Sequence, residues 1–330
     1  MTYLITGGAG YIGAHVVRAM RAAGEEVVVY DDLSTGDSGR VPDEVPLVVG
    51  STLDGGLLGR TLSEHGITGV VHLAAKKQVG ESVERPLYYY RENVQGLRTL
   101  LEAVAAGAVR SFVFSSSAAV YGMPDAGLVT EDTPCSPMSP YGETKLAGEW
   151  MVRAAGRAHG FATACLRYFN VAGAGTPELA DTGVYNLVPM VFEKITAGAA
   201  PVIFGDDYAT ADGTCVRDFI HVEDLADAHA AAAGKLASLS EPTDLTCNIG
   251  RGEGVSVREM VDLIRSVTGY GEATPEIAPR RAGDPARVVA SAERIMKELG
   301  WSAKYDAAAM VRSAWDGWCL RHPEARRPRG

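Results

Sequence analysis

The stretch TGGAGYIG at residues 6–13 decides the fold that we expect for this chain. It follows a short apolar run at residues 3–6 and precedes a helix-like run at residues 14–23. The glycines match G-x-x-G-x-x-G from Gly7 and G-x-G-x-x-G from Gly8. Glycine at these spacings permits a tight turn and lets a pyrophosphate approach the backbone, while the next helix N-terminus offers unpaired N–H groups to the anion. A strand, a glycine loop and a helix in this order predict a dinucleotide-binding unit.

An acidic residue, Asp31, follows the second strand-like run at residues 26–30. Its carboxylate can accept hydrogen bonds from the ribose diol of NAD, and it would repel the 2′-phosphate of NADP. No arginine occurs in residues 31–37 to hold such a phosphate. We therefore expect the cofactor to be NAD.

Strand-like and helix-like segments alternate along the first half of the chain, which predicts an α/β fold with a Rossmann-type doubly wound parallel sheet. The apolar runs show no polar alternation, as expected for parallel strands covered on both faces. The predicted strands are residues 3–6, 26–30, 46–49, 69–74, 111–116 and 162–168. The predicted helices are residues 14–23, 55–65, 86–106 and 141–159.

The regular alternation of strand-like and helix-like segments ends at about residue 170. Loops and a polar, turn-rich stretch at residues 208–213 follow. A helix is predicted at residues 256–268, with Ser256 as N-cap and Glu259 at the capping-box spacing, followed by an irregular segment at residues 269–284. We predict an NAD-binding Rossmann domain and a smaller C-terminal α/β lobe that binds the substrate. The domain comprises residues 1–169, with 215–252 returning to it, and the lobe comprises residues 170–214 and 253–330.

The composition is that of a globular protein, and its charge argues against nucleic acid as a partner. The 330 residues carry 31 Lys and Arg against 41 Asp and Glu, a formal net charge of −10. The basic cluster at residues 321–329 is short and broken by proline. The five cysteines form no C-x-x-C pair and no histidines lie at zinc spacing, so we expect no metal, reduced thiols and a cytoplasmic location. The uncharged residues 1–17 resemble neither a signal peptide nor a membrane span, so we expect no membrane partner.

A serine, a tyrosine and a lysine form the candidate catalytic set. Tyr141 and Lys145 are spaced as Y-x-x-x-K and therefore share a helix face, and Pro140 suits the start of that helix. We expect the lysine ammonium, together with the positive charge of bound NAD, to favour the tyrosine phenolate and make it a base near neutral pH. Ser115 and Ser117 lie at the end of a predicted strand, at the edge where open α/β sheets bind ligands.

At this point the chain resembles the extended short-chain dehydrogenase/reductase superfamily and, within it, the UDP-galactose (UDP-glucose) 4-epimerases. The segments that carry the resemblance are TGGAGYIG at 6–13, DDLSTG at 31–36, VGESV at 79–83, SSSAAVYG at 115–122, SPYGETK at 139–145, LRYFN at 166–170, DGTCVRDFIHVEDL at 212–225 and RRAGD at 280–284. The glycine loop and Y-x-x-x-K mark the superfamily, whereas the last three segments are more specific to the epimerases.

The resemblance implies that UDP-galactose and UDP-glucose are interconverted by inversion at C4, through transient oxidation to a 4-ketose by tightly bound NAD. It implies Ser117, Tyr141 and Lys145 as the catalytic residues. The implied cofactor-binding residues are Gly7, Gly10, Tyr11, Ile12, Asp31, Leu33, Ser51, Leu73, Ala74, Lys77, Asn93, Ser115, Tyr141, Lys145 and Phe169. The implied substrate-binding residues are Ser117, Tyr141, Asn170, Asn186, Leu187, Phe204, Arg217, Arg281, Asp284 and Val288.

The resemblance also implies a homodimer that pairs the helices at residues 86–106 and 141–159 of each subunit. Apolar residues of these helices could lie in the core or at such an interface, and we expect most of them in the core. They are Leu97, Leu100, Leu101, Val104, Leu146 and Trp150.

Departures from the family pattern leave alternatives open. Ser51 stands where relatives usually carry an acidic adenine contact, and Val288 stands where many carry a bulky tyrosine. The smaller valine leaves room for a larger 2-substituent, so 4-epimerisation of UDP-N-acetylglucosamine and UDP-N-acetylgalactosamine, or of UDP-glucuronate, is an alternative. A nucleotide-sugar dehydratase needs an acid and a base after the serine, where this chain has Ala118 and Ala119. A net oxidoreductase would consume cofactor steadily, and a non-catalytic NAD sensor tends to lose the tyrosine or lysine that is present here.

Overall fold

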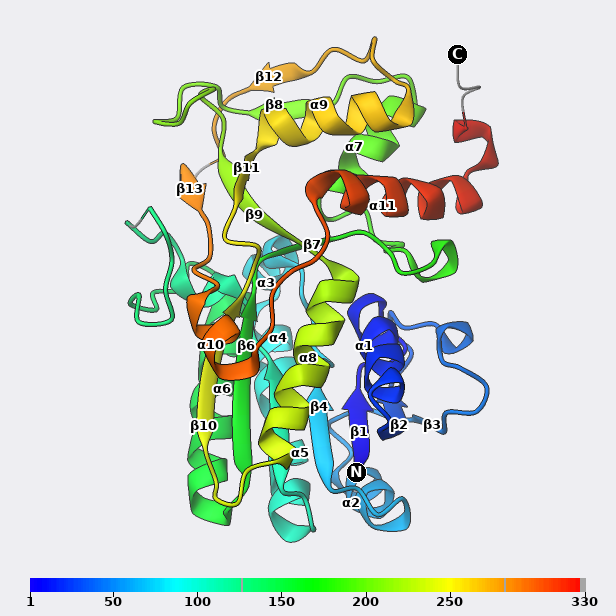
Figure 1. The fold of residues 1–330 in the computed structure, drawn as a ribbon, viewed down its shortest axis with the longest axis vertical. Helices are drawn as coiled ribbons and strands as arrows, with labels where there is room; N and C mark the ends of the chain where they lie inside the picture. Colours follow the sequence, from blue (N-terminus) through cyan, green and yellow to red (C-terminus); the bar gives the residue numbers. More distant parts are fainter. Residues whose placement is uncertain (126, 282, 327–330) are drawn as a thin grey trace.

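The chain builds a central parallel sheet flanked by helices, with a smaller lobe beyond one end of its strands (Figure 1). The structure is a computed structural model that describes residues 1–125, 127–281 and 283–326. Within these residues the sheet has seven strands. In spatial order they are β10 (Asp244–Ile249), β6 (Ala162–Tyr168), β5 (Ser111–Ser115), β4 (Gly69–His72), β1 (Thr2–Thr6), β2 (Glu26–Asp31) and β3 (Leu47–Val49). The predicted Rossmann-type fold is confirmed.

Successive residues along a strand pack into apolar cores on opposite faces of the sheet, which explains why polar residues do not interrupt the apolar runs in the sequence. Tyr3 and Ile5 of β1 pack into a core with α1 (Tyr11–Ala22) and α8 (Val222–Ala237) on one face of the sheet. Leu4, between them, packs into a second core with α2 (Gly55–Glu64), α5 (Gly96–Ala106) and α6 (Pro140–His159) on the other face. Because both faces are covered, the strands have no polar side to show in the sequence.

The order of the strands places a ligand crevice between β1 and β4. The chain runs from β1 outward to β2 and β3, and it then crosses to β4 on the other side of β1. Open α/β sheets bind ligands at such a reversal, outside the carboxyl ends of the strands. The glycine loop after β1 and the loop after β4 both lie at this point.

The predicted helix at residues 86–106 is helical throughout but not uniform. It consists of α4 (Pro86–Tyr89), a π-helical segment η2 (Tyr90–Gln95) and α5, and it is preceded by α3 (Val79–Glu84). The expectation of a core position holds for Leu97, Leu100, Leu101, Val104 and Leu146, which are buried. Trp150 is the exception, since 60% of it is exposed.

The smaller lobe lies above the carboxyl ends of the sheet in Figure 1 and has its own apolar core. Its helices are α7 (Leu187–Thr196), α9 (Val257–Thr268) and α11 (Ala307–Arg321). Its strands are β7 (Asn170–Ala172), β8 (Val202–Phe204), β9 (Val216–His221), β11 (Gly254–Ser256), β12 (Glu276–Ala278) and β13 (Arg287–Val288). The helix α10 (Glu293–Leu299) packs beside β10. The capping box of α9 is formed, with Glu259 N donating to Ser256 Oγ and Ser256 N donating to Glu259 Oε2, as predicted.

Two further sequence-based predictions can be compared with the structure in this region. The segment at residues 269–284, expected to be irregular, contains the short strand β12, which pairs with β8. Of the basic cluster, residues 327–329 lie outside the described residues, while Arg321 donates a hydrogen bond to the Asp181 carbonyl. Among the described residues, no helix combines the length and the apolar character needed to cross a membrane.

Candidate active site

The glycine loop packs so tightly that side chains are excluded from it. Gly7 has a φ of +75°, and a Cβ atom there would lie 2.7 Å from Ala74 N. A Cβ atom on Gly13 would lie 2.0 Å from Gly7 O. The helix α1 begins directly after Gly10, and no side chain of the described residues caps its N-terminus. The loop therefore leaves room and N–H donors for an anion, which fits the dinucleotide expected from the sequence.

Asp31 lies at the end of β2 beside this loop, and its carboxylate is already anchored. Oδ2 accepts from Ala9 N at 3.0 Å, and Oδ1 accepts from Leu33 N at 2.9 Å. Burial raises the pKa of Asp31, and these two backbone hydrogen bonds oppose the rise. Leu33 has a φ of 56°, a conformation that costs energy in a residue with a side chain. A carboxylate offers more lone pairs than these two bonds use, so Asp31 can still accept from a ribose hydroxyl.

The loop after β4 is held by Asn93, which lies on the π-helical segment. Asn93 Oδ1 accepts from Lys76 N at 2.8 Å, and its Nδ2 donates to Lys76 O at 2.9 Å and to Thr144 Oγ1 at 3.0 Å. The side chain predicted to touch the cofactor therefore ties the loop to α6. Lys77 is exposed, whereas Lys76 reaches across the crevice and donates to Ser34 Oγ at 2.7 Å. Sequence reasoning did not single out Lys76 in this position.

The remaining predicted cofactor residues line the same edge or support it. Leu73 N donates to the Thr6 carbonyl, and Ala74 lies against Gly7. Ser51 Oγ accepts from Leu53 N at 3.2 Å, and the nearby Asp54 caps α2 by accepting from Leu57 N. Phe169 is buried in a cluster with Leu146 and Tyr121.

The three candidate catalytic residues meet where β5 ends and α6 begins. Ser117 is the N-cap of the short helix η3 (Ala118–Tyr121), and its Oγ accepts from Ala119 N. Tyr141 is the second residue of α6, which begins with Pro140 as predicted. Ser139, which the sequence analysis did not identify, is its N-cap. Lys145 Nζ donates to the Ser115 carbonyl at 2.8 Å and lies 5.9 Å from the centre of the Tyr141 ring.

Burial governs the protonation of both residues on α6. It raises the pKa of Tyr141, and a hydrogen bond with the Ser117 side chain opposes this rise. The expectation that Lys145 favours the phenolate stays a prediction: its ammonium lies near the Tyr141 ring and binds the Ser115 carbonyl, while burial of Tyr141 acts against the phenolate. Burial also lowers the pKa of Lys145 to about 8, against the opposing charge of Glu149. Any lowering of the tyrosine pKa by the cofactor's positive charge stays a prediction.

Several predicted substrate residues gather in the smaller lobe. Arg217 on β9 forms an ion pair with Asp284, and both side chains are largely buried. The Arg281 guanidinium lies 3.9 Å from the centre of the Phe204 ring. Val288 on β13 pairs in register with Arg217 and packs against the cluster that contains Leu146 of α6. Val288 thus lies between the Arg217 region and the catalytic helix.

Other predicted substrate residues lie nearer the glycine loop. Asn170 begins β7. Asn186 immediately precedes Leu187, the first residue of α7, and its Nδ2 donates to Asp181 Oδ2 at 3.5 Å. Asn186 also lines a small cavity together with Tyr11.

The structure adds contacts that the sequence did not indicate. Ser115 Oγ donates to Tyr168 Oη at 3.2 Å, and it lies 3.3 Å from His229 Nε2 of α8. Tyr168 lies within the quoted segment LRYFN, so a signal for it existed. His229 is one of seven histidines scattered along the chain, and nothing in the sequence distinguishes it.

Comparisons with known proteins agree with this geometry. The model of the NAD dependent epimerase/dehydratase family matches residues 3–250. The UDP-glucose 4-epimerase of Halalkalibacterium halodurans is 44% identical over 98% of this chain and 97% of its own. A crystal structure of a UDP-glucose 4-epimerase has a TM-score of 0.92 at 40% identity, covering 99% of this chain and 100% of the other. The Bifidobacterium longum UDP-glucose 4-epimerase in complex with NAD⁺ and UDP has a TM-score of 0.88 at 34% identity, covering 98% and 100%.

Proposed function

Because the chain belongs to the NAD-dependent epimerase/dehydratase family, we propose that it interconverts UDP-galactose and UDP-glucose by inversion at C4, with NAD as its resident cofactor. The observation that carries this proposal is a juxtaposition at one edge of the sheet. An uncapped helix behind a tightly packed glycine loop lies at the same carboxyl edge as Ser117, Tyr141 and Lys145. Proteins that match nearly the whole chain in sequence or in fold are named UDP-glucose 4-epimerases.

In the proposed mechanism, Tyr141 and Ser117 transfer the proton of the sugar 4-hydroxyl. NAD held by the glycine loop and Asp31 would supply a hydride acceptor and donor for the sugar C4. As the phenolate, which the charges of Lys145 and of bound NAD⁺ would favour, Tyr141 Oη takes the proton of the 4-hydroxyl and later gives it back, and Ser117 Oγ bridges the sugar oxygen to Tyr141. Lys145 holds a positive charge beneath them, fixed on the Ser115 carbonyl.

The proposed substrate anchor is the diphosphate-nucleoside arm rather than the sugar. Arg217 and Arg281 are suited to bind phosphate oxygens, Phe204 can pack on the uracil, and Asp284 can accept from its ribose. An arm held in this way leaves the sugar free to present either face to the cofactor, which inversion requires. We further propose that residues 1–169 with 215–252 carry the cofactor, and that 170–214 with 253–330 carry the UDP-sugar.

We propose that the active form is a homodimer. Apolar side chains are exposed on helices that contact one another, namely α3, α4 and α6. Leu87 is 81% exposed and Trp150 is 60% exposed, and Val83 and Tyr90 add to the same set. Large apolar side chains gathered on contacting helices are typical of a surface that a partner covers, and a second copy of this chain is the occupant we propose.

The five cysteines are unpaired thiols, which supports a cytoplasmic location.

The test is to incubate the purified protein with UDP-galactose without added cofactor and to analyse the products. Formation of UDP-glucose with no net change in NADH supports the proposal. Loss of water would instead indicate a dehydratase, net accumulation of NADH an oxidoreductase, and absence of turnover a binding module. The variant Tyr141→Phe should fold and keep its NAD while turnover falls by about a hundredfold or more. Parallel incubation with UDP-N-acetylgalactosamine tests whether the valine at position 288 admits a bulky 2-substituent.

A further inference from the structure

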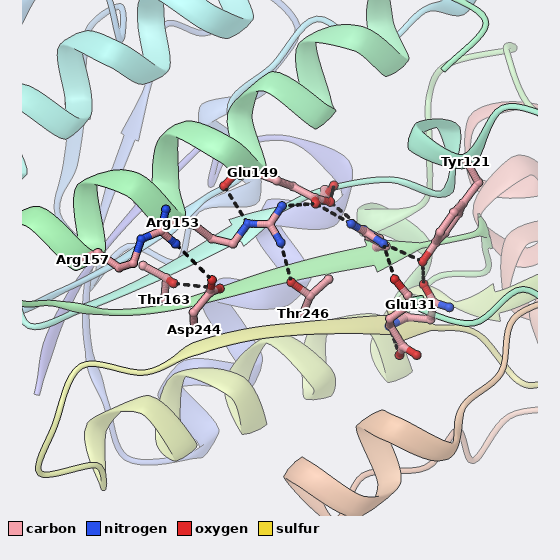
Figure 2. Close-up of polar contacts among 11 residues, drawn as sticks. Tyr121, Glu131, Glu149, Arg153, Arg157, Thr163, Asp244 and Thr246 are labelled. Atoms are coloured by element: carbon pink, nitrogen blue, oxygen red, sulfur yellow. Dashed lines mark hydrogen bonds and ion pairs between the residues drawn. The ribbon is translucent and has the colours of Figure 1, made fainter. Parts of the chain in front are cut away.

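A buried ionic cluster joins α6, β6 and the segment around Ser117, and Figure 2 shows its polar contacts. The side chain of Glu149 on α6 is fully buried, and that of Arg167 on β6 is 4% exposed. Arg167 Nε donates to Glu149 Oε1 at 2.8 Å, and its Nη2 donates to Oε2 at 2.7 Å. Arg153 also donates to Oε2, at 3.3 Å, but its side chain is 23% exposed. The Glu149 carboxylate and the Arg167 guanidinium therefore form a two-point ion pair away from water.

This ion pair holds the serine segment on both sides of Ser117. Ser116 Oγ donates to Glu149 Oε1 at 2.6 Å. Tyr121, which ends the short helix that Ser117 begins, accepts from Arg167 Nη1 at 2.9 Å and donates to Asn248 Oδ1 at 2.6 Å. Figure 2 shows the aromatic ring of Tyr121 reaching toward the cluster from the far end. The residue before Ser117 and the residue four positions after it are thus bound to the same ion pair.

The same carboxylate lies on the catalytic face of α6. Tyr141, Lys145 and Glu149 follow one another at intervals of four residues, so their side chains project from one side of the helix. Lys145 binds the Ser115 carbonyl while Glu149 binds the Ser116 hydroxyl. Two successive turns of α6 therefore form hydrogen bonds with two successive residues, Ser115 and Ser116. The position of Ser117 relative to Tyr141 follows from these two attachments.

Stability alone does not explain such a cluster. Removing two charges from water is costly, and replacing a buried ion pair by apolar side chains of similar volume is often neutral or stabilising. What this pair provides is direction, because each side-chain oxygen and nitrogen of the pair is bound to a named partner on α6, β6 or η3, or to Ser116 directly after β5. We propose that Glu149, through Arg167 and Ser116, is a positioning residue that sets the Ser117–Tyr141 geometry. This inference rests on the proposed function and extends it.

The charge on Lys145 depends on few groups around it. Tyr141 and Glu149 face it from its own helix, His72 from β4 and His229 from α8, while Tyr168 of β6 acts on Tyr141. Burial lowers the pKa of His72 to about 3 and that of His229 to about 4, so both rings are neutral near pH 7. The Glu149 carboxylate raises the pKa of Lys145, whereas burial lowers it to about 8. Removing the carboxylate therefore makes Lys145 lose its proton at a lower pH.

The test compares Glu149→Gln with the matched control Arg153→Met in the full chain with its own NAD. The readouts are kcat and KM for UDP-galactose over a pH series and the NAD content. Glu149→Gln should lower kcat by about ten- to a hundredfold, because displacing reacting groups by about 1 Å costs this much. KM should stay within about threefold, and the alkaline limb of the kcat profile should move to lower pH. Arg153→Met should retain the kcat and pH profile of the unaltered chain, since it leaves the Glu149–Arg167 pair in place.

Two further variants keep the inference testable if Glu149→Gln fails to fold with Arg167 left unpaired. The double variant Glu149→Gln, Arg167→Met removes both charges, and it should unfold near the temperature of the unaltered chain while kcat stays low and the alkaline limb stays shifted. Ser116→Ala leaves the ion pair intact and should lower kcat by about tenfold without changing the NAD content. Normal kcat and pH dependence in the folded Glu149→Gln or double variant, or normal kcat in Ser116→Ala, would overturn the inference. The proposed function fails separately if the unaltered chain does not epimerise UDP-galactose, or if Tyr141→Phe is as active as the unaltered chain.

Discussion

Adding one methyl group should have opposite effects at two helical glycines, Gly13 in α1 and Gly59 in α2. Both substitutions, Gly13→Ala and Gly59→Ala, replace the residue with the poorest helix propensity apart from proline by the one with the best, which favours the folded state by about 1 kcal/mol. At Gly59 nothing lies within 4 Å of the new Cβ atom, so this gain should appear undiminished. At Gly13 the new atom would lie 2.0 Å from Gly7 O and 2.8 Å from Gly8 Cα.

The magnitude at Gly13 follows from the movement that the methyl group demands. The Gly7 carbonyl must retreat by about 1 Å, and such overpacking typically costs about 1–3 kcal/mol. The movement also strains the hydrogen bond from Gly10 N to Gly7 O, 3.1 Å long, for about 1 kcal/mol more. After the propensity gain is subtracted, Gly13→Ala should be destabilised by about 1–3 kcal/mol. For a chain of this size, a change of about 1 kcal/mol shifts the unfolding temperature by about 2 °C.

The assay is thermal unfolding followed by circular dichroism, combined with the amount of NAD released on denaturation. Gly13→Ala should unfold about 2–6 °C below the unaltered chain and lose most of its NAD, because the displaced loop is the one that faces the pyrophosphate. Gly59→Ala should unfold about 1–2 °C above it with full NAD content. The steric reasoning is refuted if Gly13→Ala keeps both its unfolding temperature and its NAD, or if the two variants change alike.

The remaining predictions concern pH, the substrate and assembly. Burial lowers the pKa of four histidines to between about 3 and about 4, so below pH 6.5 the unfolded chain binds more protons than the folded chain. The free energy of unfolding, measured by denaturant titrations, should therefore fall as the pH drops from about 6.5 to about 4. These residues are His15, His72, His221 and His229. Asp218, with a pKa raised to about 6, acts in the opposite direction, as do Asp31, Asp224 and Asp244, whose pKa values burial raises by less. The four histidine shifts outweigh these, and unchanged stability over this range would contradict the assignment. Arg217→Met should raise KM for UDP-galactose by about ten- to a hundredfold with little change in NAD content, and an unchanged KM would argue against a phosphate contact. Leu87→Asp should convert the proposed dimer to a monomer in light scattering, and a preserved dimer would place the interface elsewhere.

The sheet and the catalytic helix were accessible from the sequence because their signals are local. The apolar runs of β1, β2 and β5 reflect burial on both faces, and the capping residues of α6 and α9 lie within a few positions of the helices that they begin. The short strands of the smaller lobe carry no such signal. Asn170–Ala172 and Val202–Phe204 become strands by pairing with β9 and β12, which lie far along the chain. Three residues are too few to show a periodicity of their own.

The electrostatics of the site could not be predicted from spacing. Y-x-x-x-K places Lys145 near Tyr141, but the carbonyl that receives the ammonium, that of Ser115, belongs to a strand end, and only the folded chain shows this contact. Glu149 and Arg153 likewise have the spacing of an exposed helical ion pair. The carboxylate becomes a buried group because Arg167, on β6, approaches it from the other side. Burial of a charge is decided by what packs against it, and that information is distributed over distant segments.

The side chain of Tyr11 shows how a motif residue can have a task outside its motif. Its backbone begins the helix behind the glycine loop, but its hydroxyl donates to the Gly173 carbonyl at 2.6 Å. One turn later His15 Nδ1 lies 2.8 Å from the Tyr11 carbonyl, and its Nε2 accepts from Gly175 N at 2.9 Å. The segment that leads from the sheet into the smaller lobe is therefore fastened to the first turns of α1. Because the proposed cofactor loop and the proposed substrate lobe share these bonds, a displacement of one must strain the other, and these contacts help to fix the position of the lobe relative to the loop.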